Sequence, residues 1–284
     1  MLTLFRALSR CPLWFLHGIG AILGWLTYWA SPTYRRRFVE NVRQAGIASA
    51  DARPAIAAAG RMVAELPFLW LRPVGEPIRP SLTWEGEALI VDALRARRGL
   101  VLLTPHMGSF EVAAQAIAQR FAAEFGPITV LYRPARKAAL RAVMDESRAR
   151  PGVSPAPATL AGVRQMIRAL RRGEAVGLLP DQVPPEGMGV WVPFFDKPAY
   201  TMTLAARLVQ QTGAVPLLIW GERLSGGAGY TVRVSALGET LPADDPTQAE
   251  SAAVINRAME RLIRQCPQQY LWGYNRYKTP RSAD

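Results

Sequence analysis

The stretch LVLLTPHMGSFEVAAQAIAQRF, residues 100–121, decides the fold class of this chain. It begins with a short, wholly apolar run that ends at Thr104, which predicts a strand buried on both faces. Helical periodicity follows from Phe110 onward, and Ser109 stands where the N-cap of a helix is expected. A buried strand that turns directly into a helix is typical of an α/β protein.

The same alternation of apolar runs and helical stretches continues along the chain. We expect strands at 128–133, 175–180, 214–220 and 230–235, helices between them, and a last helix stopped by Pro267. Near-continuous apolar strands separated by helices imply a largely parallel sheet with helices on both faces. The sequence therefore predicts an α/β fold with a mixed, largely parallel sheet.

The N-terminal segment has a different composition. Between Cys11 and Tyr34 there is no charged residue, and this apolar stretch is long enough to cross a bilayer, which takes about 20 residues. Aromatic residues near its ends and the basic triplet 35–37 are typical interfacial anchors, and the triplet favours a cytoplasmic position for the rest of the chain. A cleaved signal peptide and a helix lying in the interface are the alternatives.

These features divide the chain into two predicted parts. Residues 1–35 form the expected membrane anchor, and residues 36–284 form the expected catalytic domain, in which 36–80 are membrane-proximal helices. The segment directly after the anchor has the pattern of two amphipathic helices that end among prolines. We expect these helices to lie against the membrane or the core.

Charge and cysteine content restrict the classes of partner. The chain has 34 Lys and Arg against 22 Asp and Glu, a net charge of +12, and nearly all of its cations are arginines. The planar guanidinium matches phosphate and carboxylate groups, which favours phospholipid head groups or an acidic carrier protein. No zinc-finger, RNP-like or helix-turn-helix pattern points to nucleic acid. Cys11 and Cys266 lack CxxC spacing, so we expect neither a disulfide framework nor a metal site.

The chain has only two histidines, His17 and His106. His17 lies inside the predicted anchor, so we expect a structural or incidental role for it. His106 follows the strand at 100–104, and strand ends that meet helix starts are where α/β proteins bind ligands. Glu111 comes five residues later, which is about 140° round a helix of 3.6 residues per turn. The two side chains can therefore meet only if His106 lies in the turn before the helix.

In that arrangement His106 and Glu111 can perform acid–base chemistry. The Glu111 carboxylate would bond one imidazole nitrogen and fix the tautomer, and the other nitrogen would remove a proton from an alcohol. An oxyanion would need further stabilisation, for which free backbone amides near Gly108 and Ser109 at the helix start are candidates. We therefore expect Gly108 and Ser109 to contact substrate.

Three motifs resemble a known family. The run HMGSFE, residues 106–111, is similar to the H-x4-D/E motif of glycerolipid acyltransferases. The run LLPDQVPPEGMGVWVPFFDKPAYTMTLAARLVQQTGAVPLL, 178–218, and the tail PQQYLWGYNRYK, 267–278, resemble the bacterial lipid A biosynthesis acyltransferase family. The resemblance implies an O-acyltransferase at the bacterial inner membrane with its catalytic domain on the cytoplasmic face. It also implies acyl carrier protein or acyl-CoA as donor, a lipid A precursor as acceptor, and no other cofactor.

The resemblance also implies roles for individual residues. His106 would be the general base and Glu111 its partner, Arg133 would bind a phosphate, and Asp181 and Gln182 would position substrate. The apolar side chains of the loop at 189–200 either pack in the core or line a groove for the acyl chain, which needs apolar walls. The candidates for that groove are Trp191, Phe194 and Phe195.

Two alternatives remain open from the sequence. One is an acyltransferase that acts on another lysolipid, such as lysophosphatidic acid or an ornithine lipid. The other is a membrane-anchored protein that binds anionic lipid without catalysis, for which an arginine-rich surface would suffice.

Overall fold

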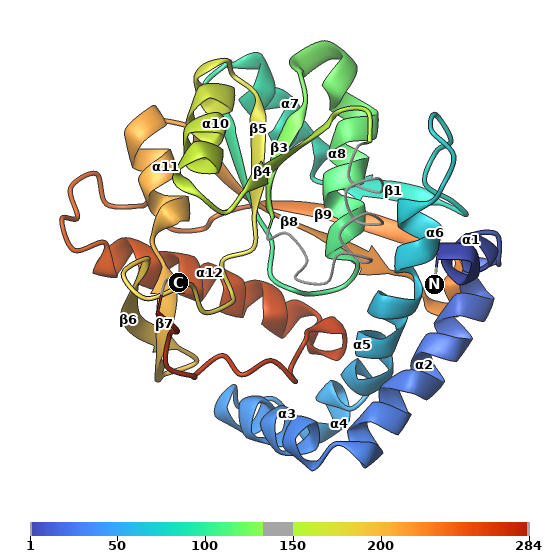
Figure 1. Cartoon of the computed structure of the whole chain (residues 1–284). Helices are drawn as coiled ribbons and strands as arrows, with labels where there is room; N and C mark the ends of the chain where they lie inside the picture. Colours follow the sequence, from blue (N-terminus) through green and yellow to red (C-terminus); the bar gives the residue numbers. More distant parts are fainter. Residues whose placement is uncertain (1, 133–149, 283–284) are drawn as a thin grey trace.

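The computed structural model describes residues 2–132 and 150–282 and contains one seven-stranded sheet (Figure 1). Its strand order is β1-β9-β8-β2-β5-β3-β4, and every neighbouring pair is parallel except β8 and β9. The predicted mixed, largely parallel sheet is therefore confirmed. The strands are β1 (Leu82–Glu85), β2 (Leu100–Leu103), β3 (Ile128–Tyr132), β4 (Val153–Pro157), β5 (Ala175–Leu178), β8 (Val215–Arg223) and β9 (Tyr230–Ala236).

Helices cover both faces of this sheet, as the alternating side chains of β2 show. Val101 and Leu103 belong to a core with α10, α11 and α12, whereas Leu100 and Leu102 belong to a core with α7 and α8. In Figure 1, α10 and α11 lie on one side of the strands and α8 on the other. The helices are α7 (Glu87–Arg95), α8 (Phe110–Phe125), α10 (Leu160–Arg171), α11 (Leu204–Thr212) and α12 (Ala249–Gln265), with 3-10 turns η1 (Ser225–Gly227) and η2 (Pro267–Gln269).

The edge strand β4 was not expected from the sequence. Its segment, VSPAP, carries Pro155 and Pro157, and proline lacks the N–H that a central strand must donate. Because β4 lies at the end of the strand order and pairs only with β3, it needs donors on one side alone. Position at the edge therefore permits a strand that composition argues against.

A two-stranded hairpin, β6 (Gly189–Phe194) with β7 (Lys197–Met202), forms where we expected a loop. Its two turn residues, Phe195 and Asp196, have φ of 48° and 60°, which non-glycine residues rarely adopt. Tertiary contacts hold the turn, because the Phe195 N–H donates to Glu260 and the Phe195 carbonyl accepts from Gln44. The turn residues do not match a typical hairpin turn sequence, so this hairpin could not be predicted from the sequence.

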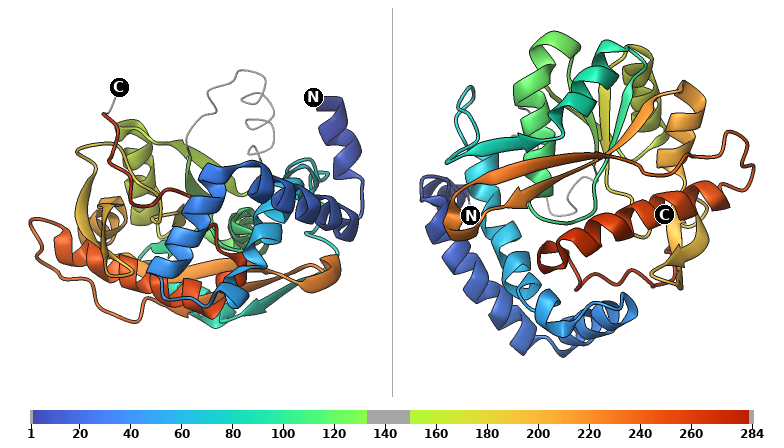
Figure 2. Two further views of the ribbon diagram at one scale, coloured as in Figure 1. Left: turned by 90° about the horizontal axis from the view of Figure 1, so that it is seen from below. Right: turned by 180° about the vertical axis from the view of Figure 1, so that it is seen from behind.

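The N-terminal helices form one group at the right and bottom of the view in Figure 1, and Figure 2 shows this group from two other sides. Within it α2 and α5 run side by side through glycines, and a Cβ added to Gly60 would stand 1.9 Å from the Gly20 carbonyl oxygen. Such contact requires the absence of side chains at these positions. The helices are α1 (Leu2–Ser9), α2 (Leu13–Ala30), α3 (Pro32–Gln44), α4 (Ser49–Ala52), α5 (Ala55–Ala64) and α6 (Leu66–Trp70).

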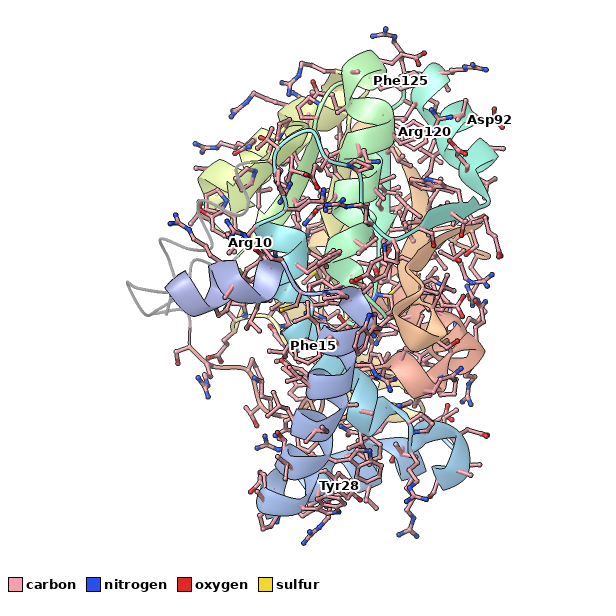
Figure 3. The ribbon with its side chains drawn as sticks, turned by 90° about the vertical axis from the view of Figure 1, so that its right-hand side faces the viewer. Arg10, Phe15, Tyr28, Asp92, Arg120 and Phe125 are labelled. Atoms are coloured by element: carbon pink, nitrogen blue, oxygen red, sulfur yellow. The ribbon has the colours of Figure 1, made fainter. Side chains whose placement is uncertain are left out.

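The outer face of α2 is apolar and exposed to solvent. Figure 3 shows α2 along the surface, where Phe15 and Tyr28 are labelled near its two ends. No helix in the described ranges is both long enough and apolar enough to cross a membrane, so the expected spanning anchor is not found there. The boundary at residue 35 stays a prediction. The large exposed side chains of this face are Trp14, Phe15, Ile22, Leu23, Leu26 and Trp29.

Candidate active site

His106 lies in the turn between β2 and α8, where we expected it. The turn is pinned by the C-terminal tail, because Leu271 donates its N–H to the His106 carbonyl at 3.1 Å and Met107 pairs with Tyr270. The imidazole is 18% exposed and lines a cavity. A histidine held this firmly at a cavity wall is suited to acid–base chemistry.

Asp181 is the carboxylate that bonds the imidazole. Its Oδ1 lies 2.7 Å from Nδ1 of His106, and its Oδ2 accepts the His106 backbone N–H at 2.9 Å. Asp181 follows β5, which is the direct parallel neighbour of β2, so the two side chains emerge at the same sheet edge. The expectation that Glu111 fixes the imidazole is thus corrected: Asp181 does so.

The surroundings of Asp181 keep it ionised although it is only 2% exposed. Burial raises the pKa of this carboxyl, but the charge and hydrogen bonds of His106 and the charge of Arg276 together lower it below its ordinary value. An ionised carboxylate only accepts hydrogen bonds, so Nδ1 of His106 carries the proton. The basic nitrogen of His106 is therefore Nε2.

Glu111 lies in the first turn of α8 and lines the same cavity as His106. The partial positive charge of the helix N-terminus stabilises a carboxylate at this position. Glu111 and His106 therefore face a common space, although the imidazole Nδ1 is bonded to Asp181.

Gly108 and Ser109 do not offer free amides to a substrate. The Gly108 N–H donates to the Gln269 carbonyl at 2.9 Å, and the Ser109 N–H donates to the Gly221 carbonyl at 2.7 Å. A Cβ on Gly108, whose φ is +56°, would stand 2.0 Å from the Gly221 oxygen. The expectation of free amides is therefore wrong, because both residues are buried and hold the turn against β8 and the tail, and their contact with substrate stays a prediction.

A buried ion pair between Arg223 and Glu65 also supports this turn. Arg223, at the end of β8, donates to both oxygens of Glu65 at 2.8 and 2.7 Å and to the Gly108 carbonyl at 2.9 Å. His17 and Tyr230 also bond Glu65, at 2.9 and 3.1 Å. His17 thus has the structural role that we expected, and it links α2 to the turn that carries His106.

An apolar cavity of about 680 Å³ opens beside His106. Its charged and polar side chains include those of His106, Glu111, Gln115, Arg150, Gln182 and Lys278, and the remaining wall is mainly apolar. Four of the five residues of β3 line the cavity, so it follows that strand for about 13 Å at 3.3 Å per residue. A volume between 300 and 1,000 Å³ with few polar groups is typical of a site for a small apolar ligand. Apolar lining residues from β2, α8, β3, β4 and β5 include Leu102, Ile117, Ile128, Val130, Val153 and Gly177.

The expected acyl groove at Trp191, Phe194 and Phe195 is not part of this cavity. Phe194 and Phe195 are each 2% exposed and pack in the core that contains α12. Trp191 is 51% exposed on the hairpin. Of the two interpretations left open for this loop, core packing is the one observed for the two phenylalanines.

Comparison with known proteins identifies the family. Residues 40–279 match the family model described as bacterial lipid A biosynthesis acyltransferase. The chain belongs to this family. It is 26% identical to the lipid A biosynthesis palmitoleoyltransferase of Escherichia coli over 221 residues, which cover 78% of this chain and 69% of the relative.

Two other relatives of this acyltransferase carry similar names. The lipid A biosynthesis lauroyltransferase of Escherichia coli is 28% identical over 194 residues, which cover 67% of this chain and 60% of the relative. A lipid A biosynthesis acyltransferase of Haemophilus influenzae is 28% identical over 185 residues, which cover 64% and 56%. Both relatives are longer than the region that the acyltransferase matches.

The structure describes only one of the two other predicted substrate-binding residues of the acyltransferase. Gln182 lines the cavity, whereas Arg133 lies outside the described residues. Sequence reasoning missed the tail residue Tyr270, which pairs with Met107 in the turn that carries His106, and the ion pair of Arg223 with Glu65. The aromatic tail was visible in the sequence, but its contact with the site depends on the path of the chain.

Replacing Asp181 with asparagine is expected to lower kcat of the acyltransferase by roughly 10²-fold or more with little change in KM. Asparagine cannot stabilise a protonated imidazole, and its amide can impose the wrong tautomer. The check is a double-mutant cycle, in which kcat is measured for Asp181→Asn, for His106→Ala and for the double variant. Because residues that act as a unit are non-additive, Asp181→Asn should cost little in a His106→Ala background. Full additivity would show that Asp181 acts apart from His106.

Proposed function

We propose that this acyltransferase moves a fatty acyl chain from a thioester donor to a hydroxyl of a lipid A precursor, with His106 as general base. The observation that carries this proposal is the His106–Asp181 pair at the wall of an apolar cavity. The donor would be acyl carrier protein or acyl-CoA. The family and the names of the relatives support lipid A as the acceptor class.

The geometry supports a direct transfer without a covalent enzyme intermediate. Nε2 of His106 takes the proton of the acceptor hydroxyl while the oxygen attacks the thioester carbonyl carbon, forming the C–O bond. The tetrahedral oxyanion then collapses, the C–S bond breaks, and the leaving thiolate receives the proton from the imidazolium. Asp181 stabilises the imidazolium between these steps, as the aspartate of a Ser-His-Asp triad does, but the nucleophile here is the acceptor itself.

Glu111 remains a proposed catalytic residue of the same cavity. Replacement of Glu111 by glutamine should lower turnover more than acceptor affinity, because a group that acts mainly on the transition state changes kcat.

The cavity along β3 would hold the acyl chain. Burying each methylene contributes about 0.8 kcal/mol, so the cavity length can select among chains. Gly177, in the interior strand β5, lines this space, and a Cβ there would meet Ile128 and Val130 only at 3.5 and 3.7 Å. A side chain at position 177 therefore fits the sheet but occupies room that the acyl chain would use.

Gly177→Val is expected to move donor preference toward shorter acyl chains. Each methylene that no longer fits should cost about 10-fold or more in kcat/KM. The measurement is kcat/KM over a series of donors of increasing chain length. Gly18→Val is the matched control, because Gly18 is exposed on α2 with nothing within 4 Å of an added Cβ. An unchanged chain-length profile for Gly177→Val would place the acyl chain elsewhere.

The membrane partner also belongs to this proposal. The exposed apolar face of α2 and the net charge of +12 suit the surface of an anionic bilayer. We place the enzyme at the bacterial inner membrane, with its catalytic site on the cytoplasmic side, where the proposed donors are found.

The acceptor is tested by mass spectrometry of lipids from cells with and without the protein. Cells that lack it should contain lipid A with one acyl chain fewer, and the parent gene should restore the missing chain. Unchanged lipid A together with an altered phospholipid or aminolipid would instead support an acyltransferase for another lysolipid.

A further inference from the structure

Two arginines, Arg72 and Arg150, lie together beside the cavity. Arg72 follows α6 and is 9% exposed, and Arg150 precedes β4. One Arg150 guanidinium nitrogen donates to the main-chain carbonyls of Trp70 at 2.8 Å and Arg72 at 2.6 Å. The Arg72 guanidinium donates to the side-chain carbonyl of Gln115 at 3.1 Å and to the main-chain carbonyl of Glu76 at 2.8 Å. Every one of these acceptors is neutral.

The positive charge of this pair has no direct counterion in the described ranges 2–132 and 150–282. There, no carboxylate oxygen lies within 4.0 Å of either guanidinium, and the Glu76 carboxylate is hydrogen-bonded to Arg79. Burial, together with the positive charge of Arg150, lowers the pKa of Arg72 to about 10, although the charge of Glu76 acts in the opposite direction. Charges held away from water are costly unless they are paired. A bound anion would therefore stabilise this pair.

One donor of the pair is also unused. Nε of Arg150 is buried and has no hydrogen-bond partner among the residues that the structure describes, which is uncommon for a buried polar atom. Arg150 and Gln115 both line the cavity that contains His106. Gln115 follows Glu111 by one turn of α8, so the two side chains lie on the same face of the helix. A group bound by Arg150 would thus share the cavity with the reacting atoms.

We propose that Arg150, supported by Arg72 and Gln115, is a phosphate-binding subsite for one of the two substrates. The inference rests on the proposed function. A guanidinium presents a fork of N–H donors that matches phosphate oxygens. The phosphate can belong to the acceptor lipid or to the phosphopantetheine arm of the donor. Its binding would orient that substrate relative to His106.

The test compares each substrate with its counterpart that lacks the phosphate. In the acceptor arm the lipid A precursor is compared with its dephosphorylated form, and in the donor arm acyl-phosphopantetheine is compared with acyl-pantetheine. The parent should prefer the phosphorylated form in one arm by about 10- to 100-fold in kcat/KM, as expected for a hydrogen bond between charged groups. Arg150→Gln should lose that preference, and the arm in which it is lost identifies the phosphate.

The matched control is Arg168→Gln, which removes the same charge from the exposed surface of α10. It should keep the preference of the parent. If Arg150→Gln kept the parental preference in both arms, the subsite would be refuted.

A second measurement does not depend on turnover. Inorganic phosphate should raise the melting temperature of the parent relative to chloride at equal ionic strength, and this rise should be smaller for Arg150→Gln. Equal rises in the two proteins would contradict the subsite. If Arg150→Gln does not fold because its main-chain contacts are lost, Arg150→Lys replaces it. Lysine keeps the charge but lacks the fork of N–H donors, so both the preference for the phosphorylated substrate and the rise in melting temperature should be partly reduced. A parent without transfer activity would overturn the proposed function, whereas the melting data would still decide the subsite.

Discussion

Replacing His106 with alanine is expected to lower kcat for acyl transfer by about 10²- to 10⁴-fold. The variant has no group to take the proton from the acceptor hydroxyl, and Asp181, buried behind the imidazole, is not among the residues that line the cavity. Folding should be little affected, because the main-chain bonds of the turn to Asp181 and Leu271 remain. The measurement is the initial rate of transfer in purified membranes, with melting temperature recorded for both proteins.

The control for His106→Ala is Trp191→Ala, which removes an exposed side chain outside the cavity. That variant should keep the parental rate. Transfer by His106→Ala at the parental rate would exclude His106 as the base. Absence of transfer in the parent, with lipid binding retained, would favour the alternative of a non-catalytic lipid-binding protein.

Replacing Glu65 with alanine is expected to lower the free energy of unfolding by about 3–5 kcal/mol. The change leaves the buried guanidinium of Arg223 without its counterion and removes the acceptor of His17 and Tyr230. The check is urea-induced unfolding. The matched control is Glu40→Ala, which breaks an exposed pair with Arg36 and should cost no more than about 1 kcal/mol. Equal losses in the two variants would show that the buried pair contributes little.

Low pH should remove the stabilisation that the same ion pair provides. Burial raises the pKa of Glu65, but the charge and hydrogen bonds of Arg223 and the hydrogen bond to His17 lower it to about 2 in the folded protein. An unfolded glutamate titrates near 4.3, so the stabilising contribution is complete above that pH and is lost as the pH falls toward 2. Glu65→Gln should therefore lose less stability than the parent between pH 4.3 and pH 2. A parallel loss in both proteins would contradict this assignment.

The sheet could be predicted because its strands are chemically uniform. The apolar runs that became β2, β3, β5, β8 and β9 are mostly buried, and such strands leave a clear pattern. The segment 153–157 and the hairpin around Phe195 leave none. In the first a sheet edge tolerates proline, and in the second Glu260 and Gln44 hold an unusual backbone.

The active site was only partly predictable for a related reason. The five-residue spacing from His106 to Glu111 correctly required His106 to lie in the turn. It did not indicate which carboxylate reaches Nδ1, because Asp181 lies 75 residues away and comes close only when β5 pairs with β2. The apolar wall likewise comes from several separate elements, so the double phenylalanine at 194–195 was a poor guide to it.

By itself the sequence determined the α/β class, the strand-end position of His106 and the resemblance to lipid A acyltransferases, because each depends on neighbours along the chain. The tertiary structure decided the partner of His106, the role of Gly108 and Ser109, and the walls of the cavity. It also placed His17, from the apolar N-terminal stretch, on the buried pair that supports the active-site turn. These properties depend on strand pairing and on the packing of α2 against α5, which join residues far apart in the sequence.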